Sequence, residues 1–221
     1  MVLINIKMVR VYSLEGNIGS GKSTMFLELQ RLFKQNKKIC FLDEPIDEWN
    51  TIKDSQQETI LSKFYRDQKK YAFSFQMMAY ISRLSLLKKA LRKNYDVIIT
   101  ERSVYTDQNI FAKMLYDSGM IEEINYQIYL RWFMDFVTEI PTIHYIYIRV
   151  QPKTAYNRVV KRARKGENIR LDYLQKCHQY HEAWISKIKD TKCIINADGD
   201  IQNNPKIMQE WIATVRAFVM C

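Results

Sequence analysis

The sequence predicts an α/β fold in which a parallel five-stranded sheet is flanked by helices. Short apolar runs alternate along the chain with longer segments of helical periodicity. The 221 residues include 6 glycines and 4 prolines, too few for the many tight turns of an all-β fold. Strands that alternate with helices are joined by helical crossovers and therefore run parallel.

Strands are expected at the apolar runs near Val9–Leu14, Lys38–Leu42, Asp96–Thr100, Ile143–Val150 and Cys193–Asn196. Helices are expected near Lys22–Gln35, Tyr65–Arg92, Ser103–Asp117, Glu122–Glu139, Pro152–Arg164, Leu171–Asp190 and Pro205–Phe218. No linker rich in Pro, Gly or Ser interrupts the chain, so residues 1–221 are expected to form one domain. Parallel sheets bind ligands outside the carboxyl ends of their strands, which makes the residues after each strand the candidates for a site.

The first strand runs directly into a glycine-rich motif, EGNIGSGKST at residues 15–24. Glycines let the backbone wrap so that successive N–H groups point at phosphate oxygens. A helix that starts near Lys22 adds the positive end of its dipole, the lysine binds the β- and γ-phosphates, and Ser23 reaches Mg²⁺. The motif therefore predicts a nucleoside triphosphate site, with nucleotide-binding residues Gly16, Asn17, Gly19, Ser20, Gly21, Lys22, Ser23 and Thr24.

Acidic residues follow the second and third strands. Glu44 is interpreted as a general base or a metal-associated acid, with a helix cap or turn carboxylate as the alternative. Glu101 follows the third strand at the place where P-loop enzymes hold Mg²⁺. Arg102, beside it, is expected to neutralise charge on a reacting oxygen.

The expected helix near Tyr65–Arg92 carries a stripe of aromatic residues, which usually marks a core face. Gln76 and Arg83 interrupt this stripe seven residues apart, so they share one face of the helix. Polar groups on an aromatic face suit hydrogen bonding to a planar nucleobase. The spacing leaves both interpretations open.

An arginine cluster ends the expected helix near Pro152–Arg164. Arg158 and Arg162 are four residues apart and share a helix face, and Arg164 follows them. The cluster is either a solvated basic face, a nucleic-acid patch, or a lid that brings positive charge over a transferring γ-phosphoryl group.

Composition restricts the class of protein further. The net charge is +10, but the basic residues are spread along the chain, which favours a polyanionic nucleotide ligand over nucleic acid. The four cysteines have no metal-type spacing and are expected to be reduced thiols. No apolar run is long enough to span a bilayer, and the first residues do not match a signal or transit peptide. We therefore expect a cytoplasmic enzyme without a membrane or nucleic-acid partner.

Together these motifs resemble the deoxyribonucleoside kinase family, in its deoxycytidine and deoxyguanosine kinase branch. The matching segments occur in the family's order and are EGNIGSGKST (15–24), DEP (43–45) with Trp49, FSFQ (73–76), SR (82–83), ERSVYTD (101–107), RVVKRAR (158–164) and HQYHEAW (178–184). The resemblance implies a P-loop kinase fold with an Arg-rich lid near residues 158–168. It also implies a homodimer and transfer of a phosphoryl group from ATP, UTP or another nucleoside triphosphate to the 5′-hydroxyl of a deoxyribonucleoside.

The resemblance also implies roles for individual residues. Glu44 would be the base on the 5′-hydroxyl, assisted by Arg102. Independently of the resemblance, we expect burial to raise the pKa of Glu44, which would help it accept a proton. The donor phosphates and Mg²⁺ would be bound by Lys22, Ser23, Glu101 and the lid residues Arg158, Arg162 and Arg164. The loop near the donor's base would include Asp200 and Ile201. The nucleoside would contact Trp49, Tyr65, Phe75, Gln76, Phe111 and Glu167.

Two further positions indicate substrate choice. Thymidine-preferring members of the family have small or apolar residues where this chain has Arg83 and Asp107. Such a charged pair fills space near a thymine methyl, so we expect deoxycytidine or purine deoxynucleosides to be preferred over thymidine. The alternatives are a nucleoside monophosphate kinase of the thymidylate kinase type and a non-catalytic nucleotide- or nucleic-acid-binding module.

Overall fold

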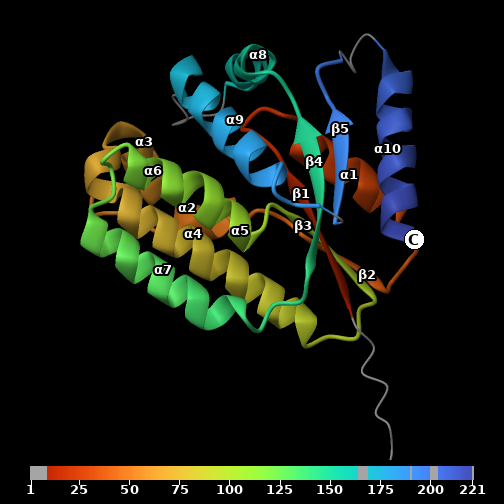
Figure 1. Ribbon diagram of the computed structural model, residues 1–221, viewed down its shortest axis with the longest axis horizontal. Coiled ribbons are helices and arrows are strands. Elements are labelled where there is room, and N and C mark those ends of the chain that lie inside the picture. Colours follow the sequence, from red (N-terminus) through yellow and green to blue (C-terminus); the bar gives the residue numbers. More distant parts are fainter. Residues whose placement is uncertain (1–8, 164–168, 190, 200–203, 221) are drawn as a thin grey trace, which may run out of the picture.

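The computed structural model describes residues 9–163, 169–189, 191–199 and 204–220. At its centre is a five-stranded parallel sheet with the strand order β2-β3-β1-β4-β5 (Figure 1). The strands are β1 (Arg10–Glu15), β2 (Ile39–Leu42), β3 (Val97–Glu101), β4 (Ile143–Arg149) and β5 (Lys192–Asn196). The expected α/β class is confirmed, and each expected strand is found within one or two residues of its predicted bounds.

Helices connect the strands and cover both faces of the sheet. They are α1 (Lys22–Leu32), α2 (Ile46–Thr51), α3 (Ile60–Arg66), α4 (Gln68–Leu91), α5 (Val104–Thr106), the π-helical segment η1 (Asp107–Ala112), α6 (Lys113–Asp117), α7 (Glu123–Val137), α8 (Pro152–Arg162), α9 (Leu171–Ile185) and α10 (Pro205–Met220). None of the helices in the described ranges is long and apolar enough to cross a membrane.

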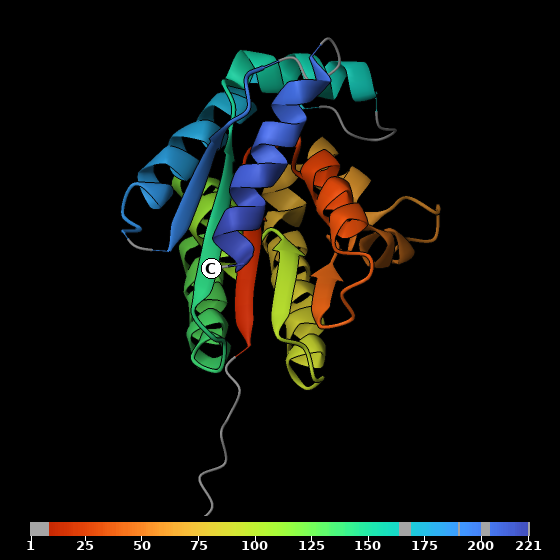
Figure 2. The same ribbon diagram turned by 90° about the vertical axis from the view of Figure 1, so that its right-hand side faces the viewer.

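The two faces of β1 pack against different helices because side chains alternate along a strand. Tyr12 and Leu14 pack in a core with residues of α1 and α10, which stand in front of the sheet in Figure 2. Val11 packs on the opposite side with Leu87 of α4 and Ile185 of α9. The strand is therefore buried on both faces, as the middle strand of a parallel sheet must be.

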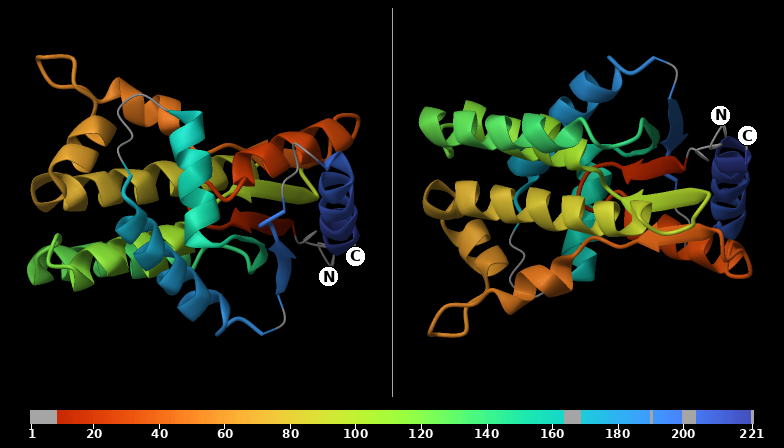
Figure 3. Two further views of the ribbon diagram at one scale, coloured as in Figure 1. Left: turned by 90° about the horizontal axis from the view of Figure 1, so that it is seen from above. Right: turned by 90° about the horizontal axis from the view of Figure 1, so that it is seen from below.

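A second core extends away from the sheet between α4 and α7, which run side by side in both views of Figure 3. Tyr80, Tyr129 and Phe133 pack against one another in this core and are at most 3% exposed. α8 lies at the top of the view in Figure 1, beyond the carboxyl ends of the strands. The carboxyl ends of β1, β2 and β3 lie between α8 and the core formed by α4 and α7.

The helices differ from the sequence expectations in five places. α1 ends at Leu32 rather than near Gln35, and α9 ends at Ile185 rather than near Asp190. The single helix expected from Tyr65 is two helices, because Asp67 leaves helical geometry and caps α4 by accepting a hydrogen bond from the N–H of Lys70. α2 is an additional short helix after β2.

The fifth difference concerns the helix expected near Ser103–Asp117. Its first and last turns are α-helical, but Asp107–Ala112 form a π-helix. A π-helical insertion rotates the residues after it relative to a regular α-helix, and such insertions are common at functional sites. Asp107 and Phe111, two residues predicted to contact substrate, both lie in this segment.

Candidate active site

A cleft of about 1100 Å³ opens at the carboxyl ends of the strands. Most of the residues predicted to form a site line this cleft, although they come from segments spread over the chain. Those that line it are Gly19, Ser20, Gly21, Lys22, Ser23, Thr24, Glu44, Trp49, Tyr65, Phe75, Gln76, Arg83, Glu101, Arg102, Asp107, Phe111, Arg158 and Arg162. Arg164, Glu167, Asp200 and Ile201 lie outside the described residues.

The glycine-rich loop joins β1 to α1 and packs tightly against two other elements. Gly16 and Gly19 both have positive φ values, 147° and 79°. A Cβ on Gly19 would lie 2.5 Å from the carbonyl oxygen of Ala155 on α8, and one on Gly16 would lie 2.6 Å from the carbonyl oxygen of Ile148. Side chains at either position would therefore push the loop away from β4 or α8.

Lys22, the first residue of α1, is buried and points back into the loop. Its Nζ donates a hydrogen bond to the carbonyl oxygen of Asn17 at 2.8 Å. Asn17 does not line the cleft; its Nδ2 donates to the carbonyl oxygen of Leu174 at 2.8 Å and ties the loop to α9. Burial and the nearby charge of Arg102 lower the pKa of Lys22 to about 7. An anionic ligand in the loop would favour the protonated form.

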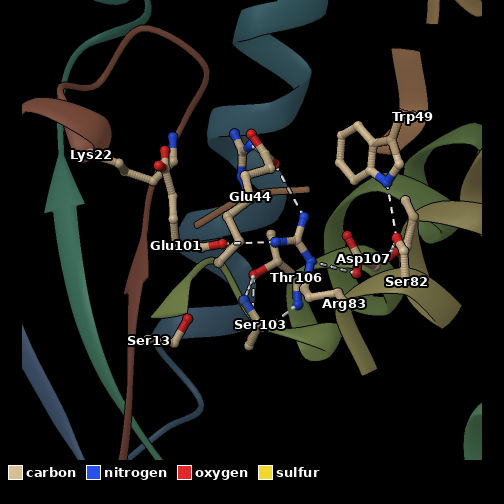
Figure 4. A network of polar contacts seen from close by, with 12 residues as sticks. Ser13, Lys22, Glu44, Trp49, Ser82, Arg83, Glu101, Ser103, Thr106 and Asp107 are labelled. Carbon is tan, nitrogen blue, oxygen red and sulfur yellow. Dashed lines mark hydrogen bonds and ion pairs between the residues drawn. The ribbon is translucent and has the colours of Figure 1, made fainter. Parts of the chain in front are cut away.

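Glu44 follows β2 and is held by two arginines from other elements (Figure 4). Its Oε1 accepts a hydrogen bond from Nη1 of Arg102 at 2.8 Å and from Nη2 of Arg83 at 3.1 Å. Both guanidinium side chains are 7% exposed. The carboxylate is therefore fixed at the cleft wall by two charge-assisted bonds.

The expectation that burial raises the pKa of Glu44 is wrong for this site. Burial alone does favour the neutral acid, but attraction to Arg102, Arg83 and Lys22 is stronger and lowers the pKa of Glu44 to about 2. Glu44 is thus a carboxylate at neutral pH.

Besides Glu44, Arg83 binds two further segments of the site, η1 and the end of β3. Its Nε donates to Oδ2 of Asp107 at 3.0 Å, and its Nη1 donates to the carbonyl oxygen of Glu101 at 2.7 Å. Burial raises the pKa of Asp107 to about 6, although the charge of Arg83 opposes this shift. The Arg83–Asp107 pair is a fixed part of the cleft wall because neither side chain is more than 7% exposed.

Ser23 and Glu101 bring two oxygen atoms together at the loop end of the cleft. The Ser23 hydroxyl donates to Oε1 of Glu101 at 2.7 Å. A hydroxyl and a carboxylate are ligands that Mg²⁺ accepts, usually together with water and substrate phosphates rather than in a complete protein cage. Within the ranges that the structure describes, no group of three or more His, Cys, Asp or Glu side chains could hold a metal.

Aromatic residues line the other end of the cleft. Trp49 and Phe75 meet edge to face with their ring centroids 5.4 Å apart, and Nε1 of Trp49 donates to the Ser82 hydroxyl at 2.9 Å. Gln76 is 2% exposed, and its Oε1 has no hydrogen-bond partner among the described residues. An unpaired buried acceptor is unfavourable, so a ligand that donates a hydrogen bond here would remove this penalty.

Arg158, on α8, joins three segments around the loop end of the cleft. Its Nη1 donates to the carbonyl oxygen of Ser20 at 3.2 Å, and its Nη2 donates to those of Ala197 and Gly199 at 2.9 Å and 3.1 Å. Arg162, one turn later on α8, also lines the cleft. The shared face predicted for these two arginines is therefore directed at the cleft.

Two features of the site were missed by the sequence analysis. Tyr173 of α9 and Trp211 of α10 line the cleft but follow no recognisable motif. Glu15, which ends β1, is fully buried and accepts hydrogen bonds from Ser13, Ser103 and Thr106. The sequence signals for Glu15 are its position, an acidic residue at the end of an apolar strand, and its place as the first residue of EGNIGSGKST, to which no role was given.

Comparison with known proteins agrees with this geometry. The model of a family described as deoxynucleoside kinase matches residues 12–220. A probable deoxycytidine kinase of Fowlpox virus is 32% identical over 216 residues, which cover 94% of this chain and 87% of the viral protein. The mitochondrial deoxyguanosine kinase of Xenopus laevis is 31% identical and the match covers 96% of this chain and 90% of that protein. Human deoxycytidine kinase is 31% identical, over 80% of this chain and 75% of its own length.

The family match covers the glycine-rich loop, the strand ends that carry Glu44 and Glu101, and the arginines of α8 in one continuous alignment. With the α/β sheet, the cleft and the relatives in agreement, this chain belongs to the deoxynucleoside kinase family.

Proposed function

We propose that this chain, as one kinase domain over residues 1–221, transfers the γ-phosphoryl group of ATP or another nucleoside triphosphate to the 5′-hydroxyl of a deoxynucleoside. One observation carries the proposal: the Glu44 carboxylate is fixed by Arg102 and Arg83 in the same cleft that contains Lys22 of the glycine-rich loop. A carboxylate that faces a phosphate-binding loop can orient a hydroxyl nucleophile toward the phosphorus atom. In-line transfer needs this positioning more than covalent chemistry.

The donor triphosphate is assigned to the loop end of the cleft. The N–H groups of the glycine-rich loop and the start of α1 bind its phosphates together with Lys22, which the negative charge keeps protonated. Ser23 and Glu101 are proposed to hold Mg²⁺, which neutralises charge on the β- and γ-phosphates when bound. Gly16, Asn17, Gly19, Ser20, Gly21 and Thr24 shape or support the loop, and Asp200 and Ile201 are proposed near the donor's base.

The acceptor nucleoside is assigned to the aromatic end. Gln76 is proposed to bind the base through its buried amide, with Trp49, Phe75 and Phe111 around the ring. Tyr65 and Glu167 are proposed to bind the sugar 3′-hydroxyl. The unpaired oxygen of Gln76 supports this assignment, because a base with an amino group supplies the missing donor.

Glu44 then acts on a bound 5′-hydroxyl as a hydrogen-bond acceptor that orients the oxygen for attack. Its low pKa makes it a weak base, which is compatible with a loose transition state because the proton need not leave before the phosphorus–oxygen bond forms. Arg102, with Arg158, Arg162 and Arg164, is proposed to stabilise the charge that develops on the transferring group.

The buried Arg83–Asp107 pair is proposed to exclude thymidine. The pair occupies the cleft wall beside Gln76 on α4 and is fixed by three hydrogen bonds from the Arg83 guanidinium. A thymine methyl placed against these charged groups would remove their polar contacts without replacing them. Deoxycytidine or a purine deoxynucleoside is therefore the proposed acceptor.

The protein is also proposed to form a homodimer through α7. Ile124, Ile128 and Trp132 recur every four residues on this helix and are 73%, 41% and 48% exposed. Such a stripe lies on one face of a helix, and exposed apolar patches of this kind mark interaction surfaces.

The substrate assignment predicts a defined order of specificity. In assays with each of the four deoxynucleosides and Mg²⁺-ATP, kcat/KM should be higher for deoxycytidine or a purine deoxynucleoside than for thymidine. Deoxynucleoside monophosphates serve as the control acceptors and should not be phosphorylated. A higher kcat/KM for thymidine than for all three others would contradict the role given to Arg83 and Asp107.

The role of Glu44 predicts a loss of turnover without a loss of structure. Glu44→Gln should lower kcat by roughly 10²- to 10⁴-fold, because a neutral amide is a weaker hydrogen-bond acceptor than a carboxylate and cannot take up the proton of the 5′-hydroxyl. Glu48→Gln is the matched control, since Glu48 is exposed on α2 and does not line the cleft. Near-normal turnover by Glu44→Gln, with an unchanged circular dichroism spectrum, would refute the assignment.

The pKa of Lys22 predicts proton uptake when the donor binds. In the free protein Lys22 is mostly neutral above its pKa of about 7. A bound triphosphate raises this pKa, so calorimetric titration with a non-hydrolysable ATP analogue should show uptake of close to one proton at about pH 8 and almost none at about pH 6. Lys22→Arg should abolish the uptake, because a guanidinium stays protonated; an unchanged uptake in this variant would assign the proton to another group.

The α7 stripe predicts the mass of the protein in solution. Light scattering should give twice the chain mass, and Trp132→Glu should give the single-chain mass because a charge would be buried in the interface. Leu27→Glu is the control, since Leu27 is 50% exposed on α1. A single-chain mass for the unsubstituted protein would exclude the dimer.

A further inference from the structure

Arg102 has a backbone conformation that its side chain disfavours. Its φ is 62°, in the left-handed region, and the other non-glycine residues with positive φ in the described ranges are Gln57 and Ala163. A residue with a Cβ is strained in this region and stays there only when neighbouring contacts hold it.

Glu15 supplies these contacts from the end of the neighbouring strand. Its Oε1 accepts hydrogen bonds from the Ser103 N–H at 3.1 Å and from the Ser103 hydroxyl at 2.7 Å, and its Oε2 accepts one from the Thr106 hydroxyl. Ser13, which lies on the same face of β1, donates a further bond to Oε1 at 2.7 Å. The carboxylate thus reaches across from β1 to the residue that directly follows Arg102.

The backbone of Arg102 is therefore fixed on both sides. Its own N–H donates to the carbonyl oxygen of Leu14 at 3.0 Å, and the next N–H donates to Glu15. With the backbone fixed in this way, the side chain is directed at Glu44, where Nη1 is 2.8 Å from Oε1. The strained backbone and the side-chain contact with Glu44 thus belong to the same residue, Arg102.

Glu15 is otherwise an unexpected residue in this position. Its side chain is fully buried, and no cation forms an ion pair with it within the ranges the structure describes. A buried carboxylate without a paired cation is unfavourable unless hydrogen bonds satisfy it. Here the donors are three hydroxyls and one backbone N–H, and two of these four come from Ser103.

We propose that Glu15 is a positioning residue for catalysis, which holds the left-handed Arg102 turn and so fixes the Arg102 guanidinium against Glu44. The inference rests on the proposed function, because it assumes that this guanidinium acts in phosphoryl transfer. Glu15 itself contacts no substrate in this scheme. A displacement of about 1 Å at a catalytic group lowers turnover by roughly 100-fold, so the effect of losing Glu15 should be measurable.

The test compares two substitutions of Glu15. Glu15→Met has a similar length but accepts no strong hydrogen bond, so it should lower kcat by roughly 10- to 100-fold while the KM for the deoxynucleoside changes little. Glu15→Gln keeps an oxygen for the Ser103 N–H, and its amide NH₂ can donate to the Thr106 hydroxyl. This variant should recover most of the lost kcat. Ser13→Ala, which removes a bond to Glu15 without touching Ser103, is the control and should keep the normal kcat.

A double-mutant cycle separates positioning from general stability. Because Glu15 acts through Arg102, adding Glu15→Met to Arg102→Ala should cause no further loss of kcat. Equal fold losses in the two backgrounds, a normal kcat in folded Glu15→Met, or a Glu15→Gln variant as inactive as Glu15→Met would each overturn the proposal. Where Glu15→Met does not fold, Ser103→Ala takes its place and should give a smaller loss with the same non-additivity.

The crystal structure of Glu15→Met gives a second measurement that does not depend on activity. Arg102 should leave its left-handed conformation or its 2.8 Å contact with Glu44. An unchanged Arg102 would overturn the inference even in an active enzyme. A displaced Arg102 in a protein whose unsubstituted form phosphorylates no deoxynucleoside would support the structural link and refute the proposed function instead.

Discussion

The structure depends on a group of charged and titratable side chains around the carboxyl ends of β1, β2 and β3. The group comprises Lys22, Glu44, Arg83 and the adjacent pair Glu101 and Arg102, which come from four segments, and each would be unfavourable as a buried charge alone. Each is stabilised by opposite charges that the other segments supply. The parallel sheet is what makes this arrangement available, because it brings the ends of sequence-distant strands to one edge.

This mutual stabilisation explains why charge, rather than burial, decides the properties of Glu44. Two guanidinium groups hold the carboxylate ionised, while Asp107, which has one guanidinium partner, has a raised pKa. The same type of side chain therefore has opposite pKa shifts a short distance apart. Asp107, which lies in the π-helical segment, forms its ion pair with Arg83.

The sequence was sufficient to predict the strands, the glycine-rich loop and the residues that follow β2 and β3, because these depend on local patterns. The break at Asp67 and the π-helix after Thr106 could not be predicted, since a regular helical pattern continues through both. The low pKa of Glu44 was missed for another reason: it depends on Arg83 and Arg102, which are distant in the chain. Glu15 escaped notice because its partners, Ser103 and Thr106, are ordinary polar residues that reveal their role only when β1 and β3 are paired.

The contacts of Arg158 have a consequence for how the enzyme discriminates between bound states. Its guanidinium already donates to the carbonyl oxygens of Ser20, Ala197 and Gly199. A phosphate oxygen that recruits Arg158 must compete with these neutral acceptors, so part of the attraction is lost in replacing them. An oxygen whose negative charge grows during transfer, as that of the leaving phosphate does in a loose transition state, competes better than the same oxygen in the ground state. An arginine whose donors are already hydrogen-bonded to the protein therefore favours binding of the transition state over binding of the ground-state complex.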